Sequence, residues 1–351
     1  MPTTTPLLAM TTAELAVELG SRTRALELTR WLWRQPVLLR VLPDVVDGVS
    51  GHALRGLRTT AMLESPVVQA RVRAGDGTTK YALDFAGTTV ETVRIPAAGR
   101  STVCVSSQAG CTRTCVFCAT KELGFLRQLT AAEMLAQFFV ARAEAPPDAP
   151  ARNVVFMGMG EPMDNLDEVL RAVDVLTQSP APQLRARQVT VSTSGVLPGM
   201  RRFLAESTAS LALSLNATTD ETRERLMPQT RTWPIAALLG ALHDDAVRSP
   251  KRLTFVEYVL FAGLNDTDAD ADRLVQLLRG LRVRVNVIPH NPFPGSTLVP
   301  PSADRVRAFQ ERVLSQGIIC LRRQPRGRDI AAACGQLVLA RSGDGFSPPN
   351  S

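Results

Sequence analysis

From about residue 100 onward, short runs of apolar and β-branched residues alternate with longer helical stretches. The runs predict strands at 102–106, 153–157, 189–193, 211–215, 253–260, 283–288 and 318–322. Helix start signals stand between them, such as TAAE at 130–133 and NLDE at 165–168, and a last helix is predicted over 303–314. This alternation predicts an α/β fold with a mostly parallel sheet and right-handed crossovers. An open sheet and a partial barrel both satisfy it.

Polar and glycine-rich motifs follow the predicted strands. A cysteine-rich loop follows the first strand, and GMGEP at 158–162 follows the second. STSG at 192–195 closes the third strand, SLN at 214–216 the fourth and PHNP at 289–292 the sixth. The active sites of (β/α) barrels are assembled at the carboxyl ends of their strands. Because all five motifs share that face, we expect a partial (β/α)6 barrel rather than an open sheet.

The first 95 residues follow a different pattern. TTAE at 11–14 is a capping box that starts a short helix, and a second helix is predicted over 21–34. From about residue 63 to 95 short strands follow, with a turn at GDG, 75–77. We interpret residues 1–95 as a small accessory domain, 96–341 as the core, and 342–351 as a disordered tail. The arginines of the second helix indicate either a solvated face or an RNA contact.

Composition and charge narrow the class of protein. Among the 351 residues, 45% are apolar and 21% charged, which excludes global disorder and a fibrous fold. The net charge is +7, and only Lys80, Lys121 and Lys251 are lysines among 40 basic residues. So many arginines suit a phosphate-bearing partner such as RNA, or reflect composition alone. The sequence contains no run apolar enough for a membrane helix and no visible signal peptide, so we expect a cytoplasmic protein.

Cysteine spacing is the most informative feature of the chain. Cys111, Cys115 and Cys118 form C-x3-C-x2-C, while Cys320 lies in an apolar run and is expected in the core. Three thiolates on a tight loop can hold three corners of an iron–sulfur cube, leaving one iron open to a small chelating molecule. Structural zinc normally takes four protein ligands, and no fourth cysteine or histidine stands at a suitable spacing. The pattern therefore favours a cluster over zinc.

This spacing, with Phe117 before the third cysteine, resembles the radical S-adenosylmethionine (SAM) superfamily. The resemblance implies a 4Fe-4S cluster whose open iron binds SAM, and whose electron cleaves SAM to a 5′-deoxyadenosyl radical. The GMGEP stretch resembles the superfamily's contact for the amino group of SAM. There Gly160 would let the backbone approach closely, and Glu161 would compensate the ammonium charge.

Further motifs resemble the RlmN type of RNA methyltransferase over residues 91–337. They are TVCVSSQAGCTRTCVFCAT, VVFMGMGEP, VTVSTSG, LSLNA, NVIPHNPFPG and RGRDIAAACGQL. The family methylates the C2 carbon of an adenine in 23S ribosomal RNA and, in some members, transfer RNA. The resemblance implies a radical-SAM barrel with an N-terminal accessory domain and a C-terminal extension. It also implies a flavodoxin-type electron donor, and we expect a monomer.

The family's chemistry assigns roles to three further residues. By resemblance, Cys334 takes a methyl group from one SAM molecule, and a second SAM yields the radical that activates this group for addition to adenine. Cys104 then attacks the Cys334 sulfur and releases the product through a transient disulfide. Glu91 matches the family's proton acceptor, whereas without the resemblance it would be interpreted as a surface carboxylate.

Positions that match the family's SAM contacts carry mostly hydroxyl, amide or glycine groups. They are Gly160, Glu161, Ser192, Ser214, Leu215, Asn216 and Asn291. Two departures stand out, because Asn216 stands where many members of the family have histidine, and the stretch RGRD, with Arg328, replaces a more acidic version of that stretch. Two alternatives stay open at this point. One is methylation at adenine C8, as in the related Cfr type, and the other is a non-catalytic iron–sulfur protein that binds RNA.

Overall fold

A ten-stranded sheet forms the centre of the computed structural model, which describes residues 5–35, 41–62, 65–177 and 184–337. The strand order is β14-β13-β12-β11-β10-β9-β6-β5-β4-β3, and every pairing from β6 to β14 is parallel. These parallel strands are β6 (Arg100–Cys104), β9 (Ala151–Phe156), β10 (Val189–Thr193), β11 (Ser210–Ser214), β12 (Thr254–Leu260), β13 (Val283–Pro289) and β14 (Ile319–Arg322). Within the described ranges no pairing joins the two ends of the sheet. The prediction of an α/β partial barrel is confirmed.

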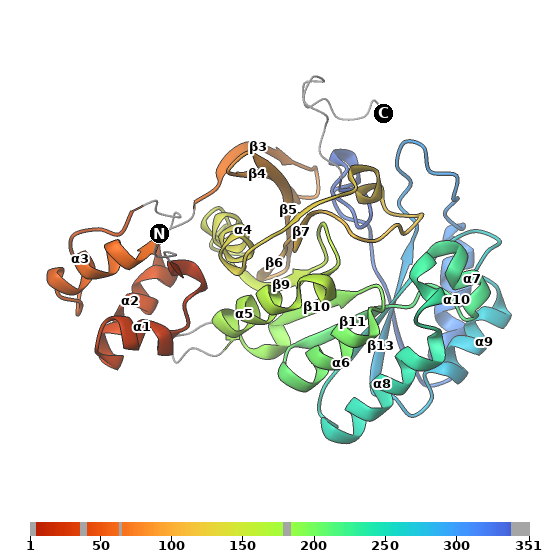
Figure 1. Cartoon of the computed structure of the whole chain (residues 1–351). Coiled ribbons are helices and arrows are strands. Elements are labelled where there is room, and N and C mark those ends of the chain that lie inside the picture. The colour runs from red at the N-terminus through yellow and green to blue at the C-terminus, as the bar shows by residue number, and fades with distance from the viewer. Residues whose placement is uncertain (1–4, 36–40, 63–64, 178–183, 338–351) are drawn as a thin grey trace.

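Helices connect the parallel strands and cover the sheet (Figure 1). They are α4 (Ala131–Ala143), α5 (Leu166–Thr177), α6 (Leu197–Glu206), α7 (Asp220–Leu226), α8 (Ile235–Arg248), α9 (Asp268–Leu277) and α10 (Ala303–Ser315). The predicted capping box at the start of α4 is confirmed, since Thr130 and Glu133 exchange side-chain and backbone hydrogen bonds. Each predicted strand lies within two residues of an observed one.

The N-terminal helices form a unit with its own core. They are α1 (Thr12–Glu18), α2 (Arg22–Arg34) and α3 (Gly51–Thr60), and a short parallel pairing joins β1 (Thr5–Pro6) to β2 (Ala61–Met62). Leu15, Leu28 and Leu54 are fully buried in this separate apolar cluster. Figure 1 shows the unit beside the sheet, and Arg171 of α5 forms a 2.8 Å ion pair with Glu14 of α1.

The strands that follow this unit belong to the main sheet. They are β3 (Val67–Arg73), β4 (Thr79–Phe85) and β5 (Thr88–Ala97), all antiparallel, and β5 pairs with β6. Tyr81 and Val93 lie in the same apolar core as the barrel strands. The core therefore continues across residue 95, where we placed the domain boundary, because backbone hydrogen bonds carry the sheet from β6 to β3.

Two sequence expectations concern the rest of the chain. The predicted disordered tail, 342–351, lies outside the described residues. Among the helices in the described ranges, none has both the length and the apolar character needed to cross a bilayer.

Candidate active site

The three clustered cysteines lie on the loop between β7 (Gln108–Gly110) and β8 (Phe125–Gln128). A glycine is required at the entry to this loop, because a β carbon on Gly110 would lie 1.8 Å from the carbonyl oxygen of Gly124. The amide of Arg113 donates to Cys111 Sγ at 3.3 Å. Gln229 Nε2 donates to Cys115 Sγ at 3.9 Å. Hydrogen bonds from the backbone and side chain of Thr120 lower the pKa of Cys118, so protein donors face all three sulfurs.

The electrostatics of this loop suit an iron–sulfur cluster, because its iron ions carry positive charge. Burial raises the pKa of Cys111 to about 12 and also raises the pKa values of Cys115 and Cys118. The charges of Cys111 and Cys118 raise that of Cys115 further, so three thiolates here repel one another. Iron ions would relieve this repulsion, since metal binding requires deprotonated thiols and neutralises them. A site for one metal ion is a different case: among the described residues, no three His, Cys, Asp or Glu side chains lie close enough together to bind a single ion.

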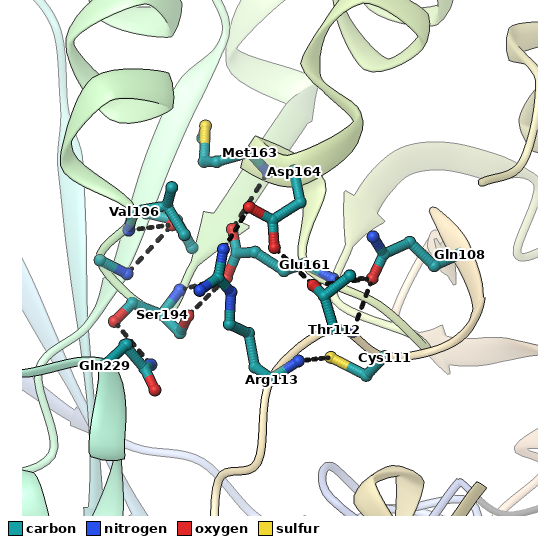
Figure 2. A network of polar contacts seen from close by, with 12 residues as sticks. Gln108, Cys111, Thr112, Arg113, Glu161, Met163, Asp164, Ser194, Val196 and Gln229 are labelled. Carbon is teal, nitrogen blue, oxygen red and sulfur yellow. Dashed lines mark hydrogen bonds and ion pairs between the residues drawn. The ribbon is translucent and has the colours of Figure 1, made fainter. Parts of the chain in front are cut away.

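The glycine-rich loop after β9 packs directly against the cluster loop. Gly160 has φ +102°, and a β carbon there would lie 2.7 Å from the backbone nitrogen of Gln108. The Gln108 side-chain oxygen accepts hydrogen bonds from the amides of Glu161 at 2.9 Å and Thr112 at 3.2 Å (Figure 2). Gly160 therefore permits a close backbone contact within the protein, which joins this loop to the residue after Cys111.

A polar network lies beside these contacts (Figure 2). Arg113 forms an ion pair with Asp164, and Thr112 donates to the same carboxylate. The Arg113 guanidinium also lies 5.6 Å from the ring centre of Trp233. These contacts hold the first part of the cluster loop against the turn that follows Glu161.

Glu161 is buried, and protein donors engage both its oxygens. Oε2 accepts from the amide and the hydroxyl of Ser194, and Oε1 accepts from the amide of Met163 at 3.0 Å. Burial raises the pKa of Glu161, and the hydrogen bonds from Ser194 oppose this shift. Sequence reasoning chose Ser192 from the STSG motif, but Ser194 is the serine that contacts Glu161. Ser192 lies half-buried on β10.

The predicted residues after β11 are held mainly by the protein. Leu215 and Asn216 are buried, and Asn216 takes φ +58°. Asn216 Oδ1 accepts from the amide of Val259 at 2.9 Å, and its Nδ2 donates to Met227 Sδ at 3.3 Å. This amide thus fixes the loop after β11 against the end of β12.

Sequence reasoning missed Arg223 of α7, whose side chain is fully buried. Its guanidinium donates to the carbonyls of Ser194, Ser214 and Leu215 at 2.6, 3.2 and 3.0 Å. Burial lowers its pKa to about 10. Arg223 therefore joins the ends of β10 and β11. No motif marks it among the many arginines of the chain.

The two remaining predicted cysteines approach the cluster loop from different elements. Cys104 ends β6 and is buried, whereas Cys334 is exposed in the segment after a short helical turn, η6 (Arg328–Ile330). Burial raises the pKa of Cys104 to about 12, and the charge of nearby Cys334 raises it too. Cys334 also raises the pKa of Cys118. The structure thus brings together Cys104, Cys118 and Cys334.

Further groups surround this pair of thiols. Asn291 Nδ2 donates to the Cys334 carbonyl at 3.3 Å, and Arg328 Nε donates to Asn291 Oδ1 at 3.0 Å. The charge of Arg323 lowers the pKa of Cys104, and its guanidinium forms a 3.4 Å ion pair with Glu257. The sixth cysteine, Cys320, is buried in the core as expected.

Glu91 lies on β5 and is fully buried, so the interpretation as a surface carboxylate is wrong. Its Oε1 lies 2.9 Å from Lys80 Nζ. The backbone carbonyl of Glu91 accepts from the hydroxyl of Ser106, which follows β6. Because Val93 pairs with Cys104 in the β5–β6 register, Glu91 lies just beyond the end of β6, beside Ser106.

Comparison with known proteins places this site in a family. Residues 105–277 match the model of the radical SAM superfamily. A protein of Syntrophobacter fumaroxidans named dual-specificity RNA methyltransferase RlmN is 44% identical over 79% of this chain and 81% of its own. A protein of the same name from Phenylobacterium zucineum is 41% identical over 96% and 91%. A crystal structure of a radical SAM methyltransferase from Sphaerobacter thermophilus matches with TM-score 0.86 and 38% identity, over 95% of this chain and 99% of that one.

The barrel presents three clustered thiols beside a glycine-rich loop. Together with these matches, this arrangement defines a radical SAM enzyme. The alternative of a non-catalytic iron–sulfur protein is thereby set aside. The chain belongs to the RlmN family of radical SAM methyltransferases. This confirms the resemblance drawn from the sequence motifs.

Proposed function

We propose that the chain transfers a methyl group to the C2 carbon of an adenine in RNA, by way of an S-methylcysteine at Cys334. The name of its relatives supports RNA as the substrate class. The observation that carries the proposal is the position of the Cys334 segment. The amide of Ala119, next to Cys118, donates to the carbonyl of Gly335, next to Cys334, at 2.7 Å. The charge of Cys334 also raises the pKa of buried Cys104. A methyl carrier, a thiol that resolves it and the cluster ligands would then share one site.

Cys111, Cys115 and Cys118 would hold a 4Fe-4S cluster, which when bound supplies the electron that cleaves SAM. The proposed SAM contacts line the loops at the carboxyl ends of the strands. They are Gly160, Glu161, Ser192, Ser214, Leu215, Asn216 and Asn291. The hydrogen bonds of Gln108 and Arg223 support this assignment, because Gln108 joins the loop after β9 to the cluster loop and Arg223 joins the loops after β10 and β11 to each other.

The contrast between the two catalytic cysteines suits different tasks. Cys334 is exposed, so its sulfur is accessible to the methyl group of a first SAM molecule, and a second SAM would be cleaved in each turnover. Cys104 is buried, and its raised pKa keeps it protonated and unreactive at neutral pH until it is needed. Cys104 would then attack the Cys334 sulfur, and a transient disulfide would release the product. Glu91 would accept the proton that leaves adenine.

Charge supports RNA as the partner, since the chain carries +7 and most of its cations are arginines. The proposed RNA contact is the accessory domain, whose helical part α1–α3 has its own core and stands beside the sheet. We further propose a cytoplasmic monomer that takes its electrons from a flavodoxin-type donor. Ribosomal RNA, with transfer RNA as a second target, is the expected substrate.

The competing product is adenine methylated at C8, because the Cfr type shares the cysteines. The RlmN name of the relatives favours C2. Mass spectrometry of 23S and transfer RNA from a methylation-deficient host that expresses this chain separates the two. We expect C2-methyladenine with wild-type protein and none with Cys334→Ala. C8-methyladenine, or unmodified RNA from protein with an intact cluster, would refute the proposal.

A further inference from the structure

We propose that the β3–β4 hairpin positions the segment that carries Cys334, and that Lys80 is the positioning residue at the centre of this contact. The consequence for catalysis rests on the proposed function, in which Cys334 must meet Cys104. The positioning itself does not depend on it. The catalytic, cluster-binding and SAM-binding residues proposed above do not include this hairpin, although it lies beside η6 in Figure 1.

The tip of the hairpin and the start of the Cys334 segment exchange hydrogen bonds in both directions. The amide of Gly327 donates to Asp76 Oδ2 at 3.2 Å, and the amide of Gly75 donates to Asp329 Oδ2 at 3.0 Å. Arg326 adds a 3.8 Å ion pair with Asp76. Two backbone amides, each bound by a carboxylate of the other segment, fix both the distance and the orientation of the two chains.

The backbone of the held segment supports a fixed geometry. Gly327 and Ala331, at the two ends of η6, both take left-handed conformations, with φ +62° and +49°. A β carbon on Gly327 would lie 2.9 Å from Thr78 of the hairpin. An alanine in this conformation persists only where its surroundings determine it. Here the amides of Ala331 and Ala332 donate to the carbonyls of Arg328 and Gly327, and one contact from outside the segment is made to the carbonyl of Ala331.

Lys80 makes that contact from a buried position on β4. Its Nζ donates to the Ala331 carbonyl at 3.2 Å and lies 2.9 Å from Glu91 Oε1. One ammonium group thus joins Glu91 to a backbone atom three residues before Cys334. Because the ion pair is buried, moving the ammonium away would separate two buried charges, which is unfavourable, so the ion pair keeps Lys80 in this position.

The other side of the segment is bound to the barrel. Asn291 donates to the Cys334 carbonyl at 3.3 Å, Gln336 Nε2 donates to the Pro292 carbonyl at 2.7 Å, and the amide of Ala119 donates to the Gly335 carbonyl at 2.7 Å. Cys334 therefore lies between two anchored points, with its own side chain exposed. The position of Ala331 therefore determines how closely Cys334 can approach Cys104.

The test compares cluster-loaded Lys80→Met with wild type and with Lys251→Met, which alters an exposed lysine. Peptide-level hydrogen exchange over 327–337 and mass-spectrometric yield of the Cys104–Cys334 disulfide under diamide are measured without SAM or RNA. We expect Lys80→Met to speed exchange in this segment by at least about tenfold and to lower the disulfide yield several-fold. Lys251→Met should match wild type in both.

Two further variants separate positioning from general stability. Lys80→Met combined with Glu91→Gln removes both buried charges, so the melting temperature should recover while exchange in 327–337 stays fast. If Lys80→Met does not fold, Asp76→Ala at the exposed hairpin tip should give the same pattern more weakly. Wild-type exchange and disulfide yield in Lys80→Met, or in Asp76→Ala where only that variant folds, would overturn the proposal. So would recovery of both readouts in the double variant. Because no step needs SAM or RNA, failure of the proposed methyl transfer would leave these results unchanged.

Discussion

Glu161 Oε2 accepts two hydrogen bonds from Ser194, from the hydroxyl at 2.6 Å and from the amide at 2.7 Å. Glu161 follows β9 and Ser194 follows β10, and these strands are neighbours in the parallel sheet. The bonds therefore fix two loops of the site relative to each other. A carboxylate suits this position because it accepts from several donors at once.

Replacing this carboxylate by an amide tests its structural role. In Glu161→Gln, one acceptor oxygen becomes a donor that faces the donors of Ser194 or the amide of Met163. We expect the free energy of unfolding to fall by about 1–3 kcal/mol, the cost of a buried donor left unpaired. Glu206→Gln, on the surface of α6, is the control and should change it by less than about 0.5 kcal/mol. Equal losses in chemical denaturation of the two variants would contradict the assignment.

Gly160→Ala tests the close approach of the glycine-rich loop to Gln108. The added β carbon would lie 2.6 Å from Gln108 Cβ, and φ +102° is strained for alanine. We expect a loss of stability of about 1–3 kcal/mol and less iron per chain, because Gln108 also holds the Thr112 amide beside Cys111. The matched control is Gly240→Ala in α8, where nothing lies within 4 Å. It should stabilise the helix by about 0.5–1 kcal/mol. Similar effects of both changes on stability and iron content would refute this reasoning.

Arg223→Met tests the guanidinium that joins β10 and β11. Methionine fills much of the volume but leaves the carbonyls of Ser194, Ser214 and Leu215 without this donor. We expect the free energy of unfolding to fall by about 3 kcal/mol, since buried carbonyls lose their hydrogen bonds. Arg225→Met, two residues along α7 and exposed, should be close to wild type. A stable Arg223→Met protein would show that the loops do not depend on this side chain.

His290 predicts a specific pH dependence of stability. It is buried, and burial together with the charge of Arg328 lowers its pKa from 6.5 to about 4. The folded state therefore prefers neutral His290. The stability that this preference contributes is fully present above pH 6.5 and is lost as the pH falls toward 4. The loss amounts to up to about 3 kcal/mol. Chemical denaturation of wild type and His290→Gln between pH 7.5 and 5 measures it. The variant should show the smaller loss, whereas exposed His243→Gln should behave like wild type. Identical slopes for all three would contradict the assignment.

The sequence predicts the architecture well because each βα unit carries its own local signals. A short apolar run gives β10, and the capping box at Thr130 starts α4. The cysteine spacing and the GMGEP motif mark the site for a similar reason, since each is a continuous stretch that needs a particular chemistry. The boundary near residue 95 depends on the β5–β6 pairing, which no local pattern reports.

Contacts between distant parts of the chain could not be predicted in this way. Lys80 and Ala331 are 251 residues apart, and their contact depends on how β4 and η6 are placed by the completed sheet. Arg223 acts through its burial, which is invisible among so many arginines, and Arg323 acts through an ion pair with Glu257 of a strand 66 positions earlier in the chain. Only the resemblance points to Glu91 in the sequence, because its burial follows from the place of β5 in the interior of the sheet and not from a local pattern.

The most direct test of the central claim follows one methyl group. Cluster-loaded protein is prepared with a deuterated methyl on Cys334 and freed of excess SAM. It is then given unlabelled SAM, a reductant and unmodified RNA for a single turnover. Transfer through Cys334 predicts that the first C2-methyladenine carries deuterium from the protein, and that Cys334→Ala gives no product. Product that carries only unlabelled methyl, while Cys334 keeps its deuterated group, would contradict the account.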